Sequence, residues 1–152
     1  SLMNWHPHTT VACIVERDGL FLMVEELDQG YTVFNQPAGH LAENENLYEA
    51  ALRETLEETA WEVELDAFLG TYQFHSPANG ITYIRHCFIA STVKHCPELP
   101  LDKDIIAAHW LSKDEILAFD FKARSPVVVK VLQDYLDGQR YPLSLINHHV
   151  TS

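Results

Sequence analysis

The densest group of chemistry-bearing side chains lies between positions 43 and 66, where nine carboxylates accompany one basic residue, Arg53. Successive residues of an α-helix advance by about 100°, so Glu54, Glu57 and Glu58 share roughly one third of the helix circumference. Converging carboxylates can hold a hard cation, because Mg²⁺ and Mn²⁺ take oxygen ligands and often join protein carboxylates to substrate phosphates. The spacing therefore predicts a divalent metal site on one face of a helix.

The alternative interpretation of this run is an ordinary solvated helix face, which is what most charge runs are. A solvated face usually carries Lys or Arg four residues from each acid, where it relieves the repulsion between like charges. Arg53 can pair with Glu57 or Glu49, but the spacing places no cation opposite Glu54 or Glu58. The repulsion between these carboxylates, which no basic residue relieves, favours the metal site over the solvated helix face.

Two residues in front of this helix, which we expect over residues 46–59, fit the same site. Gly39 permits a close approach of the backbone or an unusual dihedral angle, because it has no side chain. Glu45 adds a further acid near the start of the helix. The prediction is a carboxylate-rimmed site at the end of a loop, open to solvent on one side.

The stretch over residues 36–61 closely resembles the Nudix box, G-x5-E-x7-R-E-U-x-E-E-x-G-U, in which U is a bulky aliphatic residue. The matching positions, all at the required spacing, are Gly39, Glu45, Arg53, Glu54, Glu57 and Glu58. A match at fixed spacing over this length is far more specific than a lone glycine motif. The sequence is therefore identified as a member of the Nudix hydrolase family, which is also described as MutT-like.

Three positions depart from the box, and none of them is an expected metal ligand. Thr55 stands at the first aliphatic position, Ala60 replaces the closing glycine, and Trp61 is bulky but not aliphatic. An alanine in a left-handed conformation costs about 1 kcal/mol, so we expect the end of this helix to be built differently.

The resemblance implies an enzyme that hydrolyses a phosphoanhydride bond with Mg²⁺, or Mn²⁺, as its cofactor. Members of the family cleave a nucleoside diphosphate that is linked to a further group. Carried over to this sequence, Glu57 and Glu58 would be the main metal ligands, and Glu54 a ligand or the base for water. Arg53 would orient a glutamate through a charge-assisted hydrogen bond.

Further residues are implied as weaker members of the metal site. Glu45 would assist through a water molecule or from outside the coordination sphere, and the Gly39 carbonyl is another candidate ligand. Similar proteins of the family place an additional acid near Asp102 and Asp104, of which Asp104 is our candidate. The competing interpretation is that these loop acids are simply solvated.

Three side chains are candidates for substrate binding. Arg85 lies in the middle of a predicted strand, where it could meet a phosphate or face water. Arg124 stands at the expected start of a helix, where the helix dipole prefers anions, which favours a functional role or a buried ion pair. His40 could contact substrate, although a lone loop histidine is usually polar surface.

Segments outside the box resemble the NudJ-type phosphatase subgroup of the family, so that the similarity covers about residues 7–146. These segments are residues 35–40, 124–126 and 138–143. The subgroup removes phosphate from nucleoside di- and triphosphates, from thiamine pyrophosphate and from its hydroxymethylpyrimidine pyrophosphate precursor, and we expect this substrate class. The alternatives are an ADP-ribose or dinucleotide pyrophosphatase of the same family, or a non-catalytic nucleotide-binding module.

Apolar runs, turns and caps predict the elements that position these residues. Strands are expected at residues 9–15, 20–24, 31–34, 68–74, 81–92 and 105–111. Helices are expected at residues 46–59, from Ser112 to about Phe119, and at residues 126–136. The mixture predicts an α/β fold with a sheet between helices, and the resemblance implies the Nudix α/β/α sandwich with a mixed β-sheet.

Composition narrows the function classes. The chain has 152 residues with 22 Asp or Glu, 10 Lys or Arg and a formal net charge of −12. Because such a surface repels nucleic acids and anionic lipids, we expect a small phosphorylated substrate, with neither nucleic acid nor membrane as partner. We expect one domain over residues 1–152, present as a monomer or homodimer, in which Ser1 and Leu2 are left over from expression.

The cysteines indicate the cellular compartment. Cys13, Cys87 and Cys96 are widely spaced and form none of the local pairs that structural zinc sites need. They are typical of reduced thiols in a cytoplasmic protein, and we expect Cys13 and Cys87 to be buried in strands.

Overall fold

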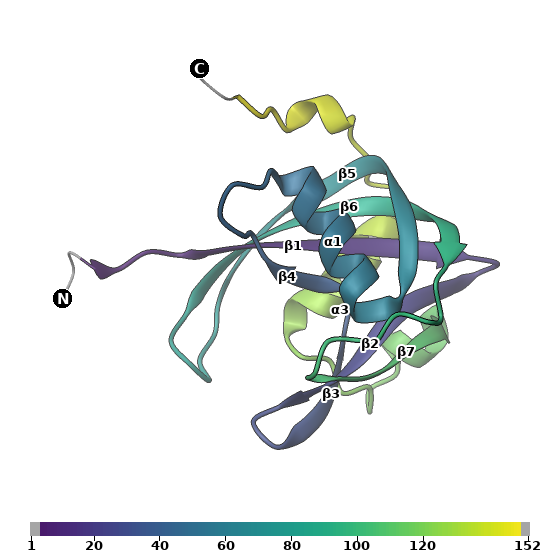
Figure 1. The fold of residues 1–152 in the computed structure, drawn as a ribbon. Helices are drawn as coiled ribbons and strands as arrows, with labels where there is room; N and C mark the ends of the chain where they lie inside the picture. The colour runs from purple at the N-terminus through teal and green to yellow at the C-terminus, as the bar shows by residue number, and fades with distance from the viewer. Residues whose placement is uncertain (1–3, 150–152) are drawn as a thin grey trace.

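A computed structural model describes residues 4–149 (Figure 1). Ser1 and Leu2, which we expect to be left over from expression, lie outside the described residues. The sheet has seven strands in the order β3-β2-β1-β6-β5, with β4 paired to β1 and β7 paired to β2. The strands are β1 (His8–Arg17), β2 (Leu20–Asp28), β3 (Tyr31–Asn35), β4 (Ala38–His40), β5 (Trp61–His75), β6 (Thr82–His95) and β7 (Ile105–Ser112). The helices are α1 (Leu47–Thr59), α2 (Lys113–Leu117) and α3 (Pro126–Leu136), followed by a short 3₁₀ helix at Leu143–Leu145.

Strand β1 lies in the middle of the sheet, and its alternate side chains pack toward different helices. Successive side chains of a strand point to opposite faces, so a strand that is buried on both faces can serve two cores. Val11 and Cys13 belong to the core that includes Ala50 of α1. Ala12 and Ile14 belong to the core that includes residues of α2 and α3. Helices therefore cover both faces of the sheet (Figure 1), and the predicted α/β/α sandwich is confirmed.

The sheet is mixed, as expected. Strand β1 runs parallel to β6 and antiparallel to β2 and β4. Among the elements formed by residues 4–149, no helix has the length and apolar character that a membrane crossing requires. The three cysteines are free and buried, which confirms the expected burial of Cys13 and Cys87.

Helix α1 begins at a capping box and ends at a left-handed residue. The Asn46 side chain accepts the backbone N–H of Glu49 at 2.8 Å, and the Glu49 side chain accepts the N–H of Asn46 at 3.0 Å. Ala60 has φ 59° and ψ 22°, so the expectation of a differently built helix end is wrong. The N–H of Ala60 donates to Leu56 at 2.9 Å, and its carbonyl accepts the N–H of Cys96 at 2.8 Å. These bonds hold the alanine in a conformation that favours glycine.

Replacing Asn46 with alanine is expected to lower the free energy of unfolding by about 1 kcal/mol, because the first turn of α1 loses its side-chain acceptor. Urea denaturation followed by circular dichroism measures the change. Asn147→Ala, at an exposed position near the end of the described chain, is the matched control. Equal losses in the two variants would contradict the capping role of Asn46.

Several elements differ from the expectations in their bounds, and one strand was not expected. Strand β2 extends to Asp28 rather than ending at residue 24, and β6 extends to His95 rather than to residue 92. Strand β5 begins at Trp61 rather than at Phe68, because residues 61–67 alternate apolar and acidic side chains with the period of a half-buried strand. Helix α2 ends at Leu117 instead of near Phe119, and the Phe119 side chain is fully exposed. The three-residue strand β4 was not predicted.

Candidate metal and phosphate site

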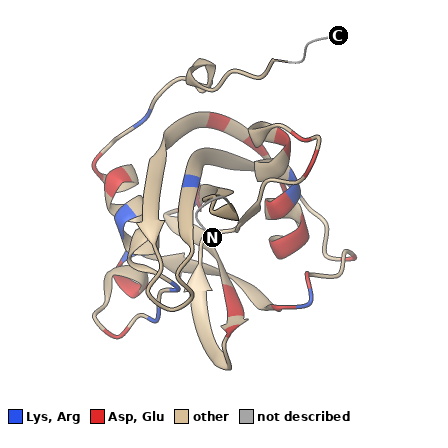
Figure 2. Ribbon diagram, turned by 90° about the vertical axis from the view of Figure 1, so that its left-hand side faces the viewer, with Lys and Arg blue, Asp and Glu red and all other residues tan. Residues whose placement is uncertain are grey.

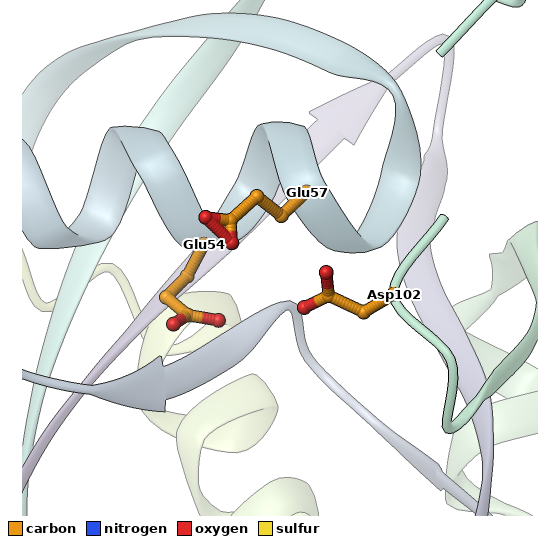
Figure 3. Close-up of side chains that lie close together, drawn as sticks. All are labelled: Glu54, Glu57 and Asp102. Carbon is orange, nitrogen blue, oxygen red and sulfur yellow. The ribbon is translucent and has the colours of Figure 1, made fainter. Parts of the chain in front are cut away.

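Three carboxylates meet beside α1, on the side that faces the loop before β7 (Figure 3). Oxygen atoms of Glu54, Glu57 and Asp102 lie within 4.8 Å of one another. Glu54 and Glu57 are three residues apart on α1, whereas Asp102 comes from the segment between β6 and β7. The backbone N–H of Asp102 donates to the carbonyl of Glu57 at 3.1 Å, which fixes this loop against the helix. We call these three residues the acidic cluster.

Arg53 crosses the helix surface and joins three glutamates. It donates to both oxygens of Glu45 at 2.6 and 2.9 Å, to Glu54 at 2.7 Å and to Glu57 at 3.2 Å. The hydrogen bonds to Glu45, and then those to Glu54 and Glu57, raise the pKa of the guanidinium above its ordinary value, so Arg53 stays charged. The expectation that no cation faces Glu54 is therefore wrong. The predicted pairing with Glu57 is present, while Glu49 caps the helix instead.

Glu45 is engaged on both of its carboxylate oxygens. Besides the two bonds from Arg53, it accepts the backbone N–H of Ala42 at 2.7 Å. The Arg53 hydrogen bond is the main reason that the pKa of Glu45 lies below its usual range. This arrangement suits a residue that orients Arg53 better than one that binds a metal directly.

Glu58 is buried, and it is not part of the acidic cluster that the described residues form. Its carboxylate accepts the backbone N–H of Ala38 at 2.9 Å. Burial raises the pKa of Glu58 to about 8, against the opposite effect of the Ala38 hydrogen bond. Glu58 nevertheless lines the same cleft as Glu54.

Gly39 of β4 lies directly against the carboxylate of Glu54. A β-carbon built at this position would fall inside van der Waals contact with the Glu54 carboxylate. The glycine that the sequence predicted at this site thus makes room for an acidic side chain.

Burial raises the pKa of Glu54, although its hydrogen bond to Arg53 opposes the shift. Burial, followed by the charge of Glu57, also raises the pKa of Asp102.

The acidic cluster opens into a cleft of about 620 Å³ that the three predicted substrate-binding residues also line. They are Arg85, Arg124 and His40. Asp104 lines the cleft as well, but Asp102 rather than Asp104 reaches the cluster. In Figure 2, acidic residues are coloured at several positions along α1, so the negative charge of this region is not confined to the cluster.

His40 sits beside a second histidine. Its Nε2 lies 3.0 Å from Nδ1 of His8, and its backbone carbonyl accepts a hydrogen bond from Arg53 at 3.2 Å. Burial, and then the nearby charges of His8 and Arg124, lower the pKa of the His40 ring. His40 therefore tends toward the neutral form at pH 7.

Sequence analysis missed Glu26, which is the partner of Arg124. The two side chains form an ion pair of 2.8 Å, and Glu26 is buried. An acid among the apolar residues of β2 was the available signal, because a buried acid needs a cation or hydrogen-bond donors. The ion pair that we considered for Arg124 is thus present, with its acidic partner buried and Arg124 itself partly exposed.

Comparison with known proteins identifies the family. The sequence profile of the NUDIX domain matches residues 6–132. The chain is a member of the Nudix family. Phosphatase NudJ of Escherichia coli strain K12 is 42% identical over 140 residues, which cover 92% of this chain and 90% of that protein. Phosphatase NudJ of Shigella flexneri matches to the same extent.

Solved structures agree with the Nudix assignment. A NUDIX hydrolase from Nitrosomonas europaea superposes with a TM-score of 0.93 at 38% identity, covering 97% of this chain and 100% of that one. A UDP-X diphosphatase superposes with a TM-score of 0.71 at 17% identity, covering 90% of this chain and 66% of that one, and it shows the fold alone. The expected Nudix fold and the expected Nudix hydrolase activity on phosphoanhydride bonds are confirmed.

Proposed function

We propose that this Nudix hydrolase is an Mg²⁺-dependent phosphatase that releases phosphate from nucleoside di- and triphosphates and from thiamine-type pyrophosphates. The observation that carries the proposal is the acidic cluster of Glu54, Glu57 and Asp102 at a cleft that also contains arginines. The relatives that bear the name phosphatase NudJ support a phosphatase activity, because their similarity extends over most of both chains. The substrate class is what the resemblance of the sequence to the NudJ-type subgroup implies.

The donor atoms of the cluster fit Mg²⁺ or Mn²⁺. All three side chains offer carboxylate oxygens, which are the ligands that hard cations prefer, and neither nitrogen nor sulfur joins the group within the described residues. Oxygens within 4.8 Å of one another can face one ion. Glu58 and the Gly39 carbonyl remain our candidates for additional ligands. Burial raises the pKa of Glu58, and a cation bound nearby would favour its charged form.

A bound divalent ion would neutralise charge on the phosphoryl oxygens and lower the pKa of a coordinated water. Arg53 keeps the carboxylates of Glu54 and Glu57 in place by donating to both. We assign to Glu54 the acceptance of a proton from the attacking water, because burial raises the pKa of this carboxyl and makes it a better base. Arg85, Arg124 and His40 provide the polar wall of the cleft for the anionic substrate.

The first test follows hydrolysis of ADP, ATP, thiamine pyrophosphate, hydroxymethylpyrimidine pyrophosphate, ADP-ribose and a diadenosine polyphosphate. Inorganic phosphate is assayed directly, and the nucleotide products that cleavage of the last two would give are separated by chromatography. We expect phosphate from the first four substrates with Mg²⁺, loss of activity in EDTA and recovery when Mg²⁺ is restored. Turnover of only ADP-ribose or the dinucleotide would contradict the substrate class and favour a pyrophosphatase of the same family. No turnover by folded protein that binds Mg²⁺ would favour a non-catalytic module.

A second test separates the two loop acids. Asp102→Asn is expected to raise the Mg²⁺ concentration for half-maximal activity by about tenfold, because the acidic cluster loses a charged oxygen ligand. Asp104→Asn should have a clearly smaller effect, since Asp104 lies outside the cluster. Activity measured over a series of Mg²⁺ concentrations compares them, and a larger effect of Asp104→Asn would refute the assignment of Asp102.

A further inference from the structure

The side chain of Arg85 is held by two uncharged acceptors. It projects from near the start of β6. Its Nη2 donates to Oδ1 of Asn35 at 2.9 Å, and its Nη1 donates to Oε1 of Gln36 at 3.1 Å. Amide oxygens satisfy N–H donors but carry no charge. Within residues 4–149, no carboxylate lies within ion-pair distance of Arg85. The charge of this guanidinium at the cleft is thus not offset by a direct ion pair.

The orientation of both amides follows from their other partners. The Nε2 of Gln36 donates to the carbonyl of Val128 at 2.8 Å, and the Nδ2 of Asn35 donates to Glu26 at 3.3 Å. The carbonyl of Val128 and the carboxylate that Glu26 presents to Arg124 accept hydrogen bonds, so the amide nitrogens face them and the amide oxygens face Arg85. Gln36 is almost completely buried, and Asn35 is buried as well. The two amide side chains that bind Arg85 are therefore part of the packed protein interior.

Arg124 lines the same cleft in a different electrostatic state. Its Nη1 donates to Glu26 at 2.8 Å, and its Nη2 lies 3.9 Å from Asp28. Glu26 is buried, whereas the side chain of Arg124 is 42% exposed. Two carboxylates thus offset the charge of Arg124, and its removal would leave Glu26 buried without a cation.

We propose that Arg85 binds a phosphate group of the substrate, and that Arg124 instead stabilises the wall of the cleft. This inference rests on the proposed function, because it assigns the anion-binding part of that site. A guanidinium presents several N–H donors in a plane and can bind a phosphate while it keeps bonds to other acceptors. Asn35 and Gln36 occupy two of the five N–H donors of Arg85 but bring no opposing charge, whereas Glu26 and Asp28 offset the charge of Arg124.

The experiment measures binding of inorganic pyrophosphate to metal-free protein in EDTA by isothermal titration calorimetry. Arg85→Gln is expected to weaken binding by roughly ten- to a hundredfold, because charge-assisted hydrogen bonds to the anion are lost. Arg85→Lys should fall between Arg85→Gln and the wild type. Arg140→Gln, at an exposed position outside the cleft, is the matched control and should bind like the wild type. Arg124→Gln should lower the melting temperature more than Arg85→Gln and weaken binding less.

The outcomes separate this inference from the proposed function. Wild-type affinity in both Arg85→Gln and Arg85→Lys would overturn the role of Arg85, as would a greater loss of affinity in Arg124→Gln. Weakened pyrophosphate binding in Arg85→Gln would support that role even if no substrate were hydrolysed. In active enzyme, Arg85→Gln should raise KM by a similar factor and change kcat less, and an unchanged KM would overturn the inference while leaving the hydrolase intact.

Discussion

Replacing Glu57 with glutamine is expected to reduce Mg²⁺-dependent hydrolysis by at least about a hundredfold. The substitution keeps the size of the side chain but removes a charge from the acidic cluster, together with the ion pair that Arg53 forms at 3.2 Å. The Glu57 side chain is 40% exposed, so the fold does not depend on it, and we expect nearly unchanged stability. Phosphate release and thermal unfolding, measured on the same sample, test both statements.

The matched control for this prediction is Glu64→Gln. Glu64 is an exposed acid of β5 outside the cleft, so its loss changes the net charge of the protein by the same amount. We expect the control to keep full activity and a normal Mg²⁺ dependence. Unchanged turnover in Glu57→Gln, or an equal decrease in the control, would refute the placement of the reaction at the acidic cluster.

Adding a methyl group at Gly39 is expected to reduce activity by roughly a hundredfold, because it displaces the carboxylate of Glu54 from the cluster. The overlap involves the end of a flexible side chain rather than the backbone, so Glu54 can move aside at little cost to the fold. The expected result for Gly39→Ala is therefore a folded protein with a damaged site. Kinetics at saturating Mg²⁺, together with a melting curve, distinguish this result from simple unfolding.

Gly70→Ala is the appropriate control for Gly39→Ala. A β-carbon at Gly70 would meet the ring of Tyr72 at 3.4 Å, which is an ordinary contact. Both variants add the same group to a strand, but only Gly39→Ala meets a carboxylate. A Gly39→Ala enzyme with normal kinetics would mean that the position of Glu54 does not limit the reaction.

The helix that carries the site was predictable because its signals are local. The cap at Asn46, the periodic spacing of the glutamates and the residues of the box all lie within one short stretch. The sheet between helices followed from the mixture of strand and helix signals along the chain. The early start of β5 could also have been predicted from the alternation of apolar and acidic side chains in residues 61–67. The acids of this segment are, however, easily grouped with those of the preceding helix.

The membership of the acidic cluster was less predictable, because it depends on contacts between distant segments. Helical spacing places Glu58 beside Glu54, but the backbone of Ala38 binds the Glu58 carboxylate. The third carboxylate of the cluster is instead that of Asp102, which lies in a loop far along the chain. No periodicity in the sequence indicates that Asp102 rather than Asp104 reaches the cluster. The bond from Arg53 to Glu54 was missed because adjacent helical residues do not normally face each other, whereas a long arginine can bend back.

Two backbone bonds tie the loop between β6 and β7 to the end of α1. The N–H of Cys96 donates to the carbonyl of Ala60, and the N–H of Asp102 donates to that of Glu57. With both points attached to the same helix end, the number of residues between them sets where the Asp102 carboxylate arrives. Deleting one residue there would shorten the reach of the loop by up to about 3.8 Å, the length of a peptide unit, so that the two bonds could not both be kept without displacing Asp102. A minimum length of this segment is therefore as much a requirement of the acidic cluster as the identity of its carboxylates.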